Sequence, residues 1–154
     1  MDPELNFPIG LSEGLAPTCN ASVINTENGN IGLTSAHCLT IEEPQGYINV
    51  EELAIPYTHL EDPDVNDYAL VKFALIDPNG GNARLQDYTG DLGWRFDIGN
   101  NTLTNVFNYL ITHFQGGVSG APMIFQYNRT EYLGYVYAVH AGYNNLTSDS
   151  VALI

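Results

Sequence analysis

The chain has very little positive charge. Its 154 residues include four Lys plus Arg against 18 Asp plus Glu, so the formal net charge is −14 at pH 7. Nucleic acids and anionic membrane surfaces are bound chiefly through clustered basic side chains. We therefore expect neither a nucleic acid nor a membrane among the partners of this protein. The acidity is typical of a protein that stays soluble through its net charge.

Long apolar runs, repeats and heptads are also missing. No segment reaches the length of a transmembrane helix, and none resembles a signal peptide. Cysteine is limited to Cys19 and Cys38, which form either a disulfide or a pair of buried thiols. Asn-x-Ser/Thr sequons begin at Asn20, Asn100, Asn128 and Asn145. Together, the cysteine pair and the sequons favour a secreted glycoprotein from an oxidising extracellular compartment.

Short apolar runs alternate with turn-forming residues along the chain. Asn28 and Gly29 lie between two such runs, residues 22–25 and 31–34, and predict a hairpin. Residues 68–75 are almost continuously apolar, which predicts a strand buried on both faces. The other expected strands are residues 47–55, 92–98, 103–114, 123–127, 132–140 and 150–153. The pattern predicts an all-β protein, either a sandwich or a pair of barrels.

Three segments carry chemically competent side chains in the order His, Asp, Ser. His37 follows an expected strand, Asp67 opens another, and Ser119 lies in a glycine-rich turn. A serine hydroxyl needs an adjacent base to act as a nucleophile, and a histidine can take up that proton and return it to the leaving group. A buried carboxylate fixes the tautomer of the histidine. Each motif alone is typical of ordinary loops, whereas the three in this order indicate a catalytic triad.

These segments resemble the signatures of the chymotrypsin-like (trypsin-fold) serine peptidases. That family carries Thr-Ala-Ala-His-Cys, Asp-Ile-Ala-Leu and Gly-Asp-Ser-Gly-Gly-Pro. The matching stretches are Thr34-Ser35-Ala36-His37-Cys38, Asp67-Tyr68-Ala69-Leu70 and Gly117-Val118-Ser119-Gly120-Ala121-Pro122. The resemblance covers roughly residues 19–143. It implies hydrolysis of peptide bonds in protein or peptide substrates, without a metal or another cofactor.

The resemblance assigns a role to each matched side chain. His37 becomes the general base, Asp67 its orienting partner and Ser119 the nucleophile. The nearby acids Asp62 and Asp64 are weaker candidates for the third member, because only Asp67 directly precedes the Ala-Leu strand.

Two further features follow from the resemblance. The backbone N–H groups of Gly117 and Ser119 would form the oxyanion hole. The cysteine before the histidine usually bridges to the one after it, which implies a Cys19–Cys38 disulfide.

The implied fold is a pair of abutting antiparallel six-stranded β-barrels with shortened loops. The N-terminal barrel would span residues 6–76 and the C-terminal barrel residues 91–154, with a linker at residues 77–90. The break at residues 77–82, rich in Asn and Gly, favours this division.

The resemblance also places a substrate-binding strand after the serine. A histidine at the position of His140 resembles the glutamyl endopeptidases, which use it to receive an acidic side chain, and His113 would lie at the pocket floor. An acidic P1 preference follows from this interpretation. The alternative is an ordinary hydrogen-bonded strand histidine, and Phe114 favours it, because those enzymes carry a threonine there. The residues expected to contact substrate are His113, Phe114, Val139, His140, Ala141 and Gly142.

The chain departs from the family pattern in two ways. Val118 replaces the aspartate that pairs with a newly cut N-terminus in trypsin-type enzymes, so we expect no activation of that kind. His37 and Asp67 are 30 positions apart, and Asp67 and Ser119 are 52 apart, so long surface loops and the usual C-terminal helix are expected to be missing.

The sequence therefore predicts a secreted, monomeric serine endopeptidase. An alternative is a catalytically inactive protease-fold protein that acts by binding, which Val118 and Ala121 favour because they differ from the family motif. A third interpretation is a processing protease of the viral type. The pair Cys19 and Cys38 weighs against it, because such enzymes act in reducing compartments.

Overall fold

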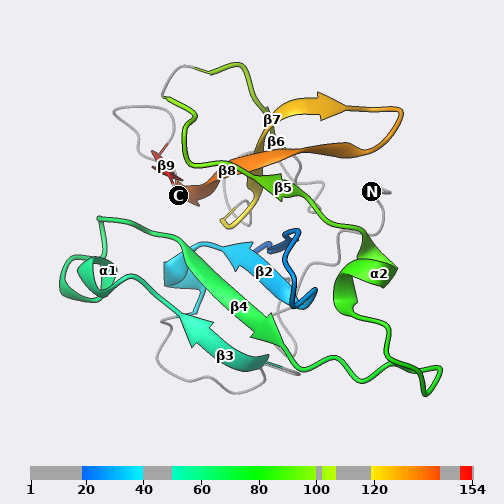
Figure 1. The fold of residues 1–154 in the computed structure, drawn as a ribbon. Coiled ribbons are helices and arrows are strands. Elements are labelled where there is room, and N and C mark those ends of the chain that lie inside the picture. Colours follow the sequence, from blue (N-terminus) through cyan, green and yellow to red (C-terminus); the bar gives the residue numbers. More distant parts are fainter. Residues whose placement is uncertain (1–18, 40–49, 100–101, 107–118, 143–149, 154) are drawn as a thin grey trace.

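The computed structural model describes residues 19–39, 50–99, 102–106, 119–142 and 150–153. Most regular structure in these residues is β-strand, arranged in two sheets that occupy separate halves of the molecule (Figure 1). The predicted all-β class is confirmed. Within the described ranges, no helix is long and apolar enough to cross a membrane.

The first sheet has four strands in the order β1-β2-β4-β3, and all its pairings are antiparallel. Its strands are β1 (Ser22–Val23), β2 (Ile31–Thr34), β3 (Val50–Ala54) and β4 (Ala69–Phe73). The predicted hairpin joins β1 to β2. Gly29 in its turn has a φ of +77°, and a Cβ there would lie 2.6 Å from Cδ of Arg84, so the turn requires glycine.

The second sheet has five strands. They are β5 (Gly93–Trp94), β6 (Asn105–Val106), β7 (Pro122–Asn128), β8 (Leu133–Gly142) and β9 (Ser150–Leu153). β8 lies between β7 and β9, to which it is antiparallel, and it also pairs in parallel with β5. The expected strand at residues 103–114 is seen as β6, and residues 107–114 lie outside the described part of the chain.

Two details differ from the predicted barrels. Among the described residues the sheets contain four and five strands, and neither closes into a six-stranded barrel. The β5–β8 pair is parallel, which the long stretch of chain between these two strands permits because no tight hairpin has to join them. The proposed division at residues 77–90 stays a prediction.

The two halves share one apolar core. Ile24 forms a parallel bridge with Leu92, and the Asn25 N–H donates to the Leu92 carbonyl at 2.8 Å. The buried core side chains from both halves are Ile24, Leu33, Leu92, Ile124, Val136 and Val139. Removing this much apolar surface from water stabilises the two halves against each other.

β4 presents different residues on its two faces. Ala69, Val71 and Phe73 are buried in a second core with Ala36 and Leu39. Leu70, on the other face, is only half-buried. The sequence prediction that both faces are buried is therefore correct for one face and partly correct for the other.

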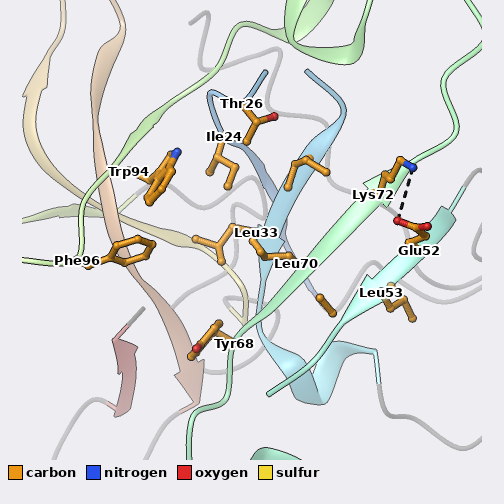
Figure 2. A pocket seen from close by; sticks show the side chains of 12 residues that line it. Ile24, Thr26, Leu33, Glu52, Leu53, Tyr68, Leu70, Lys72, Trp94 and Phe96 are labelled. Atoms are coloured by element: carbon orange, nitrogen blue, oxygen red, sulfur yellow. Dashed lines mark ion pairs between the residues drawn. The ribbon is translucent and has the colours of Figure 1, made fainter. Parts of the chain in front are cut away.

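The half-buried face of β4 borders a hollow of about 830 Å³. Figure 2 shows Tyr68 and Leu70 on one side of this hollow and Trp94 and Phe96 on the other. None of the three predicted triad residues lines it. Tyr68, which does line it, directly follows Asp67 in the chain.

Within the described ranges, three short helical elements were not predicted from the sequence. They are the 3₁₀ turn η1 (Ala36–Cys38), α1 (Tyr57–Glu61) and α2 (Leu85–Thr89). α2 begins with a local box in which the Arg84 N–H donates to Asp87 Oδ2 at 2.8 Å. The Leu85 N–H donates to the side-chain oxygen of Asn30 at 2.6 Å, so a distant residue helps to cap the helix. Helices of this length have too few residues to show a 3.6-residue period.

Candidate active site

The register of the first sheet brings His37 and Asp67 together. Thr34 at the end of β2 pairs with Ala69 at the start of β4. His37 follows Thr34 closely and Asp67 shortly precedes Ala69, so both lie at the same end of the sheet. The η1 turn then directs the chain back over that end.

Two hydrogen bonds join His37 to Asp67. His37 Nδ1 lies 2.5 Å from Asp67 Oδ2, and the His37 backbone N–H donates to Asp67 Oδ1 at 2.8 Å. An ionised carboxylate only accepts hydrogen bonds, so the proton of the neutral ring resides on Nδ1. Nε2 is then the basic nitrogen, as a general base requires. The side chains of His37 and Asp67 are 38% and 11% exposed, so an accessible base is backed by a shielded carboxylate.

Asp67 is the acid that the local structure selects. The neighbouring acids Asp62 and Asp64 are exposed, and Asp62 Oδ1 accepts the Asp64 N–H in a local turn. Asn66 has a φ of +51°, a left-handed conformation that asparagine tolerates better than most residues. Its side chain donates to Thr58 Oγ1 at 2.8 Å, which ties the turn before Asp67 to α1.

His59 is a residue at this site that sequence reasoning missed. It lies on α1, is 2% exposed, and places Nε2 3.8 Å from Asp67 Oδ1. The available signal was weak: a single histidine in an acidic stretch shortly before Asp67. Nothing local indicates that this side chain turns inward toward the carboxylate of Asp67.

Opposing influences act on the pKa of Asp67. Burial raises the pKa of Asp67. The hydrogen bonds from the ring and backbone of His37, together with the charges of His37 and His59, lower this pKa by more than burial raises it. The net pKa therefore lies below the usual value for aspartate. Asp67 is consequently ionised at neutral pH and available to stabilise a histidine cation.

This lowered pKa predicts an acid-dependent loss of stability. The contribution of Asp67 is fully present above the unfolded-state pKa of about 3.9, and it is lost as pH falls through the lower folded-state pKa. We expect the free energy of unfolding to fall less steeply below about pH 4 in Asp67→Asn than in the wild type. Urea unfolding between neutral and acidic pH measures this difference, and equal slopes would rule the contribution out.

Ser119 lies in a turn that is pinned to the N-terminal half. It forms a parallel bridge with Cys19, and its carbonyl accepts the Asn20 N–H at 2.7 Å. Gly120 follows with a φ of +78°, and a Cβ at this position would lie 2.0 Å from the Asn20 carbonyl oxygen. The tight approach of these two backbones explains why glycine follows the serine.

Ser35 connects the histidine segment to the serine turn. This fully buried side chain donates to the His140 carbonyl at 2.7 Å and accepts the Gly120 N–H at 3.0 Å. The Gly120 N–H also points to the His140 carbonyl, at 2.8 Å, and the His140 N–H donates to Ala121 at 2.9 Å. One hydroxyl therefore holds the base-bearing segment, the serine turn and strand β8 in register.

Cys19 and Cys38 form a disulfide in the structure, with their Cα atoms 6.1 Å apart. Cys38 adjoins His37, and the backbone of Cys19 forms a parallel bridge with Ser119, so the disulfide ties the His37 segment to the segment that lies beside Ser119. Both sulfurs and a ring nitrogen of His37 lie within 4.8 Å of one another. Because the sulfurs are bonded to each other, neither can serve as a thiolate ligand for a metal.

The predicted substrate-binding residues are described in part. Val139 and His140 are buried on β8, and Ala141 is half-buried. β8 continues to Gly142. The predicted residues His113, Phe114 and Gly117, and also Val118, lie outside the described residues.

The sequons differ in accessibility. Asn20 is 6% exposed and its backbone bonds to Ser119, so a glycan cannot be accommodated there in the folded chain. Asn128 is exposed at the end of β7. Asn100 and Asn145 lie outside the described part of the chain. Of the two described sequons, only the one at Asn128 is open to modification.

Solved structures of serine proteases share this architecture. The chain is similar to the protease Anisep from Arthrobacter nicotinovorans, with a TM-score of 0.67 and 17% identity over 91% of this chain and 83% of that one. It is similar to the thermostable serine protease AL20 from an extremophilic microorganism, with a TM-score of 0.63 and 14% identity over 86% and 81%. For a Glu endopeptidase in complex with MPD, the TM-score is 0.60, with 15% identity over 99% and 88%.

No protein-family model and no curated protein sequence matches the chain, so the likeness is one of structure. At these identities it shows a shared fold. The expectation of a chymotrypsin-like protease fold, with a glutamyl endopeptidase among its relatives in structure, is confirmed.

Proposed function

We propose that this chain is a serine endopeptidase that uses Ser119 as nucleophile, His37 as general base and Asp67 as the orienting carboxylate. The protease fold supports this role at the level of the architecture. The observation that carries the proposal is the two-point contact between His37 and Asp67, which leaves Nε2 as the basic nitrogen.

The reaction would proceed in two halves. The Ser119 oxygen attacks the peptide carbonyl carbon while its proton passes to His37 Nε2, giving a tetrahedral oxyanion. His37 then returns the proton to the leaving amine as the C–N bond breaks, which leaves an acyl-enzyme. Water, activated by the same nitrogen, forms the new C–O bond and releases Ser119. The N–H groups of Gly117 and Ser119 are proposed to bind the oxyanion.

A serine-directed fluorophosphonate tests this assignment. The wild type should acquire one adduct per chain, located on Ser119 by peptide mass spectrometry, because only an activated serine displaces fluoride rapidly. His37→Ala should abolish the labelling, and heat-denatured wild type is the matched control for non-specific reaction. Absence of an adduct on the folded wild type would instead favour an inactive protein that acts by binding.

We further propose a preference for acidic P1 residues. The carbonyl of His140 accepts the N–H of Gly120, the residue after the proposed nucleophile, so the backbone of His140 adjoins the turn that carries Ser119. Its side chain is buried, where one charge partner has a larger effect than in water. A Glu endopeptidase is also among the structures with this fold.

His140→Ala should therefore change specificity more than overall turnover. We expect kcat/KM to fall about 10- to 100-fold for a peptide with Glu at P1, because a charge-assisted hydrogen bond is lost. The same variant on the matched peptide with Gln at P1 is the control and should change by less than about threefold. An equal loss on both peptides would mean that His140 is only a structural strand residue.

We also propose that the protein acts outside the cell as a monomer. The Cys19–Cys38 disulfide supports this location, since such bonds persist in oxidising compartments. Mass measurement of the native protein with and without thiol alkylation tests the bond. A protein that takes up two alkyl groups without prior reduction would contradict an extracellular location.

A further inference from the structure

His59 is a buried titratable side chain that the proposed reaction does not use. It is 2% exposed and lies on α1, the short helix that precedes β4 in the chain (Figure 1). Its two ring nitrogens have separate neighbours. Nδ1 lies 3.1 Å from the Val65 carbonyl oxygen, and Nε2 lies 3.8 Å from Asp67 Oδ1.

The first of these contacts defines the tautomer. A carbonyl oxygen can only accept a hydrogen bond, so Nδ1 of His59 carries a proton. In the neutral ring Nε2 therefore carries no proton, and its lone pair faces Oδ1 of Asp67. A second proton on Nε2 would turn the same approach into an ion pair with Asp67.

Asp67 is thus placed between two histidines. Its Oδ2 atom faces the His37 ring at 2.5 Å, and its Oδ1 atom accepts the His37 N–H and faces His59. Asp67 is the charged side chain that the structure records within 4 Å of His59 among the described residues. The acids Glu61 and Asp62, at the end of α1, are exposed to solvent.

The two protonation states of His59 affect His37 differently. With His59 neutral, the negative charge of Asp67 is available to the histidine cation that forms at His37 during attack. With His59 protonated, that charge is shared with a second cation in a shielded environment, and His37 becomes a weaker base.

α1 also braces the turn that carries Asp67. The His59 ring donates to Val65, and Thr58 on the same helix accepts from the Asn66 side chain at 2.8 Å. Val65 and Asn66 immediately precede Asp67. The histidine therefore acts on both the position and the available charge of the carboxylate.

We propose that His59 is a positioning residue of the triad: in its neutral form it braces the turn before Asp67 through Val65, and when Nε2 is protonated it pairs with Asp67 Oδ1 and weakens catalysis. This inference rests on the proposed protease function. It extends that function, because a second histidine would then contribute to the loss of activity at low pH.

Two substitutions of His59 distinguish the role of Nδ1, which contacts Val65, from the role of Nε2, which faces Asp67. Asparagine places an amide near the Nδ1 position and keeps a donor for Val65, but it lacks Nε2. Glutamine reaches toward the position of Nε2 and can donate to Asp67 at every pH, so it supplies the hydrogen-bond donor of the protonated ring without its charge. Glu61→Gln, an exposed charge change on the same helix, is the matched control.

We expect His59→Gln to lower kcat about tenfold at pH 8 with KM unchanged. In His59→Asn, the fall of kcat/KM at low pH should be described by the protonation of one group. In the wild type, the same fall should require two protonations, one at His37 and one at His59. Glu61→Gln should retain the wild-type profile. Identical profiles in all four proteins would overturn the proposal. So would a loss that is confined to melting temperature while turnover per folded molecule is unchanged.

Nuclear magnetic resonance of histidine-labelled wild type supplies a readout that needs neither turnover nor a stable variant. The resonance of the proton between His37 Nδ1 and Asp67 should change its chemical shift as His59 Nε2 becomes protonated. If peptides are not cleaved but this coupling is seen, the protease function fails and the histidine–carboxylate linkage stands. If peptides are cleaved and the His37 proton does not respond to His59, the linkage fails alone.

Discussion

Asp67→Asn is expected to lower kcat by about four orders of magnitude, with KM changed by less than about threefold. The reason is the tautomer of His37. Asparagine presents an amide N–H where Oδ2 now accepts from Nδ1, so the ring is favoured with its proton on Nε2. That tautomer cannot accept the proton of Ser119.

The neighbouring acid Asp64 offers a matched control for this result. It is exposed, and its N–H takes part only in the local turn with Asp62. Asp64→Asn removes the same charge from the same segment and should leave kcat within about twofold, because exposed charges are well screened. Steady-state kinetics on one peptide measures both variants. Similar losses in the two would contradict the assignment of Asp67.

Gly120→Ala is expected to destabilise the fold by about 3 kcal/mol or more and to abolish activity. Two effects combine at this position. The φ of +78° is unfavourable for a residue with a Cβ, and the Cβ would lie 2.0 Å from the Asn20 carbonyl oxygen and 2.5 Å from Thr34 Oγ1. The backbone on either side of Ser119 would have to move. Urea unfolding and fluorophosphonate labelling measure the two consequences.

Gly80→Ala measures the cost of a left-handed backbone conformation in a place where the new Cβ meets no other atom. Gly80 has a similar φ of +71°, but nothing lies within 4 Å of a Cβ built there. This control should lose only about 1–2 kcal/mol, the usual cost of a left-handed conformation. The excess loss in Gly120→Ala would then measure the close approach of the serine turn to the N-terminal half. Equal losses would show that the approach is not a packing constraint.

Much of the fold could be predicted because its signals are local. The Asn28-Gly29 pair and the apolar run of β4 each indicate their own structure without reference to the rest of the chain. His37 and Asp67 were proposed in the same way, from short motifs at the ends of strands, and the structure shows their contact while their catalytic role stays a prediction. The structure then shows why these motifs meet, through the pairing of β2 with β4.

The features that were missed depend on contacts between distant segments. The capping of α2 uses Asn30, and the parallel pairing joins β5 to β8, about 40 positions further along the chain. The link through Ser35 needs both halves in place before its hydroxyl has partners. His59 was missed for another reason: it lies only eight positions before Asp67, but the short α1 gives no local signal that this side chain turns toward the carboxylate.

Digestion of a peptide library by wild type and by Ser119→Ala tests the central claim most directly. The account predicts internal cleavage by the wild type, enriched after Glu or Asp. For Ser119→Ala, which removes only the nucleophilic oxygen, it predicts a rate reduced by about six orders of magnitude. Cleavage that survives in Ser119→Ala, or a folded wild type that cleaves no peptide, would contradict it.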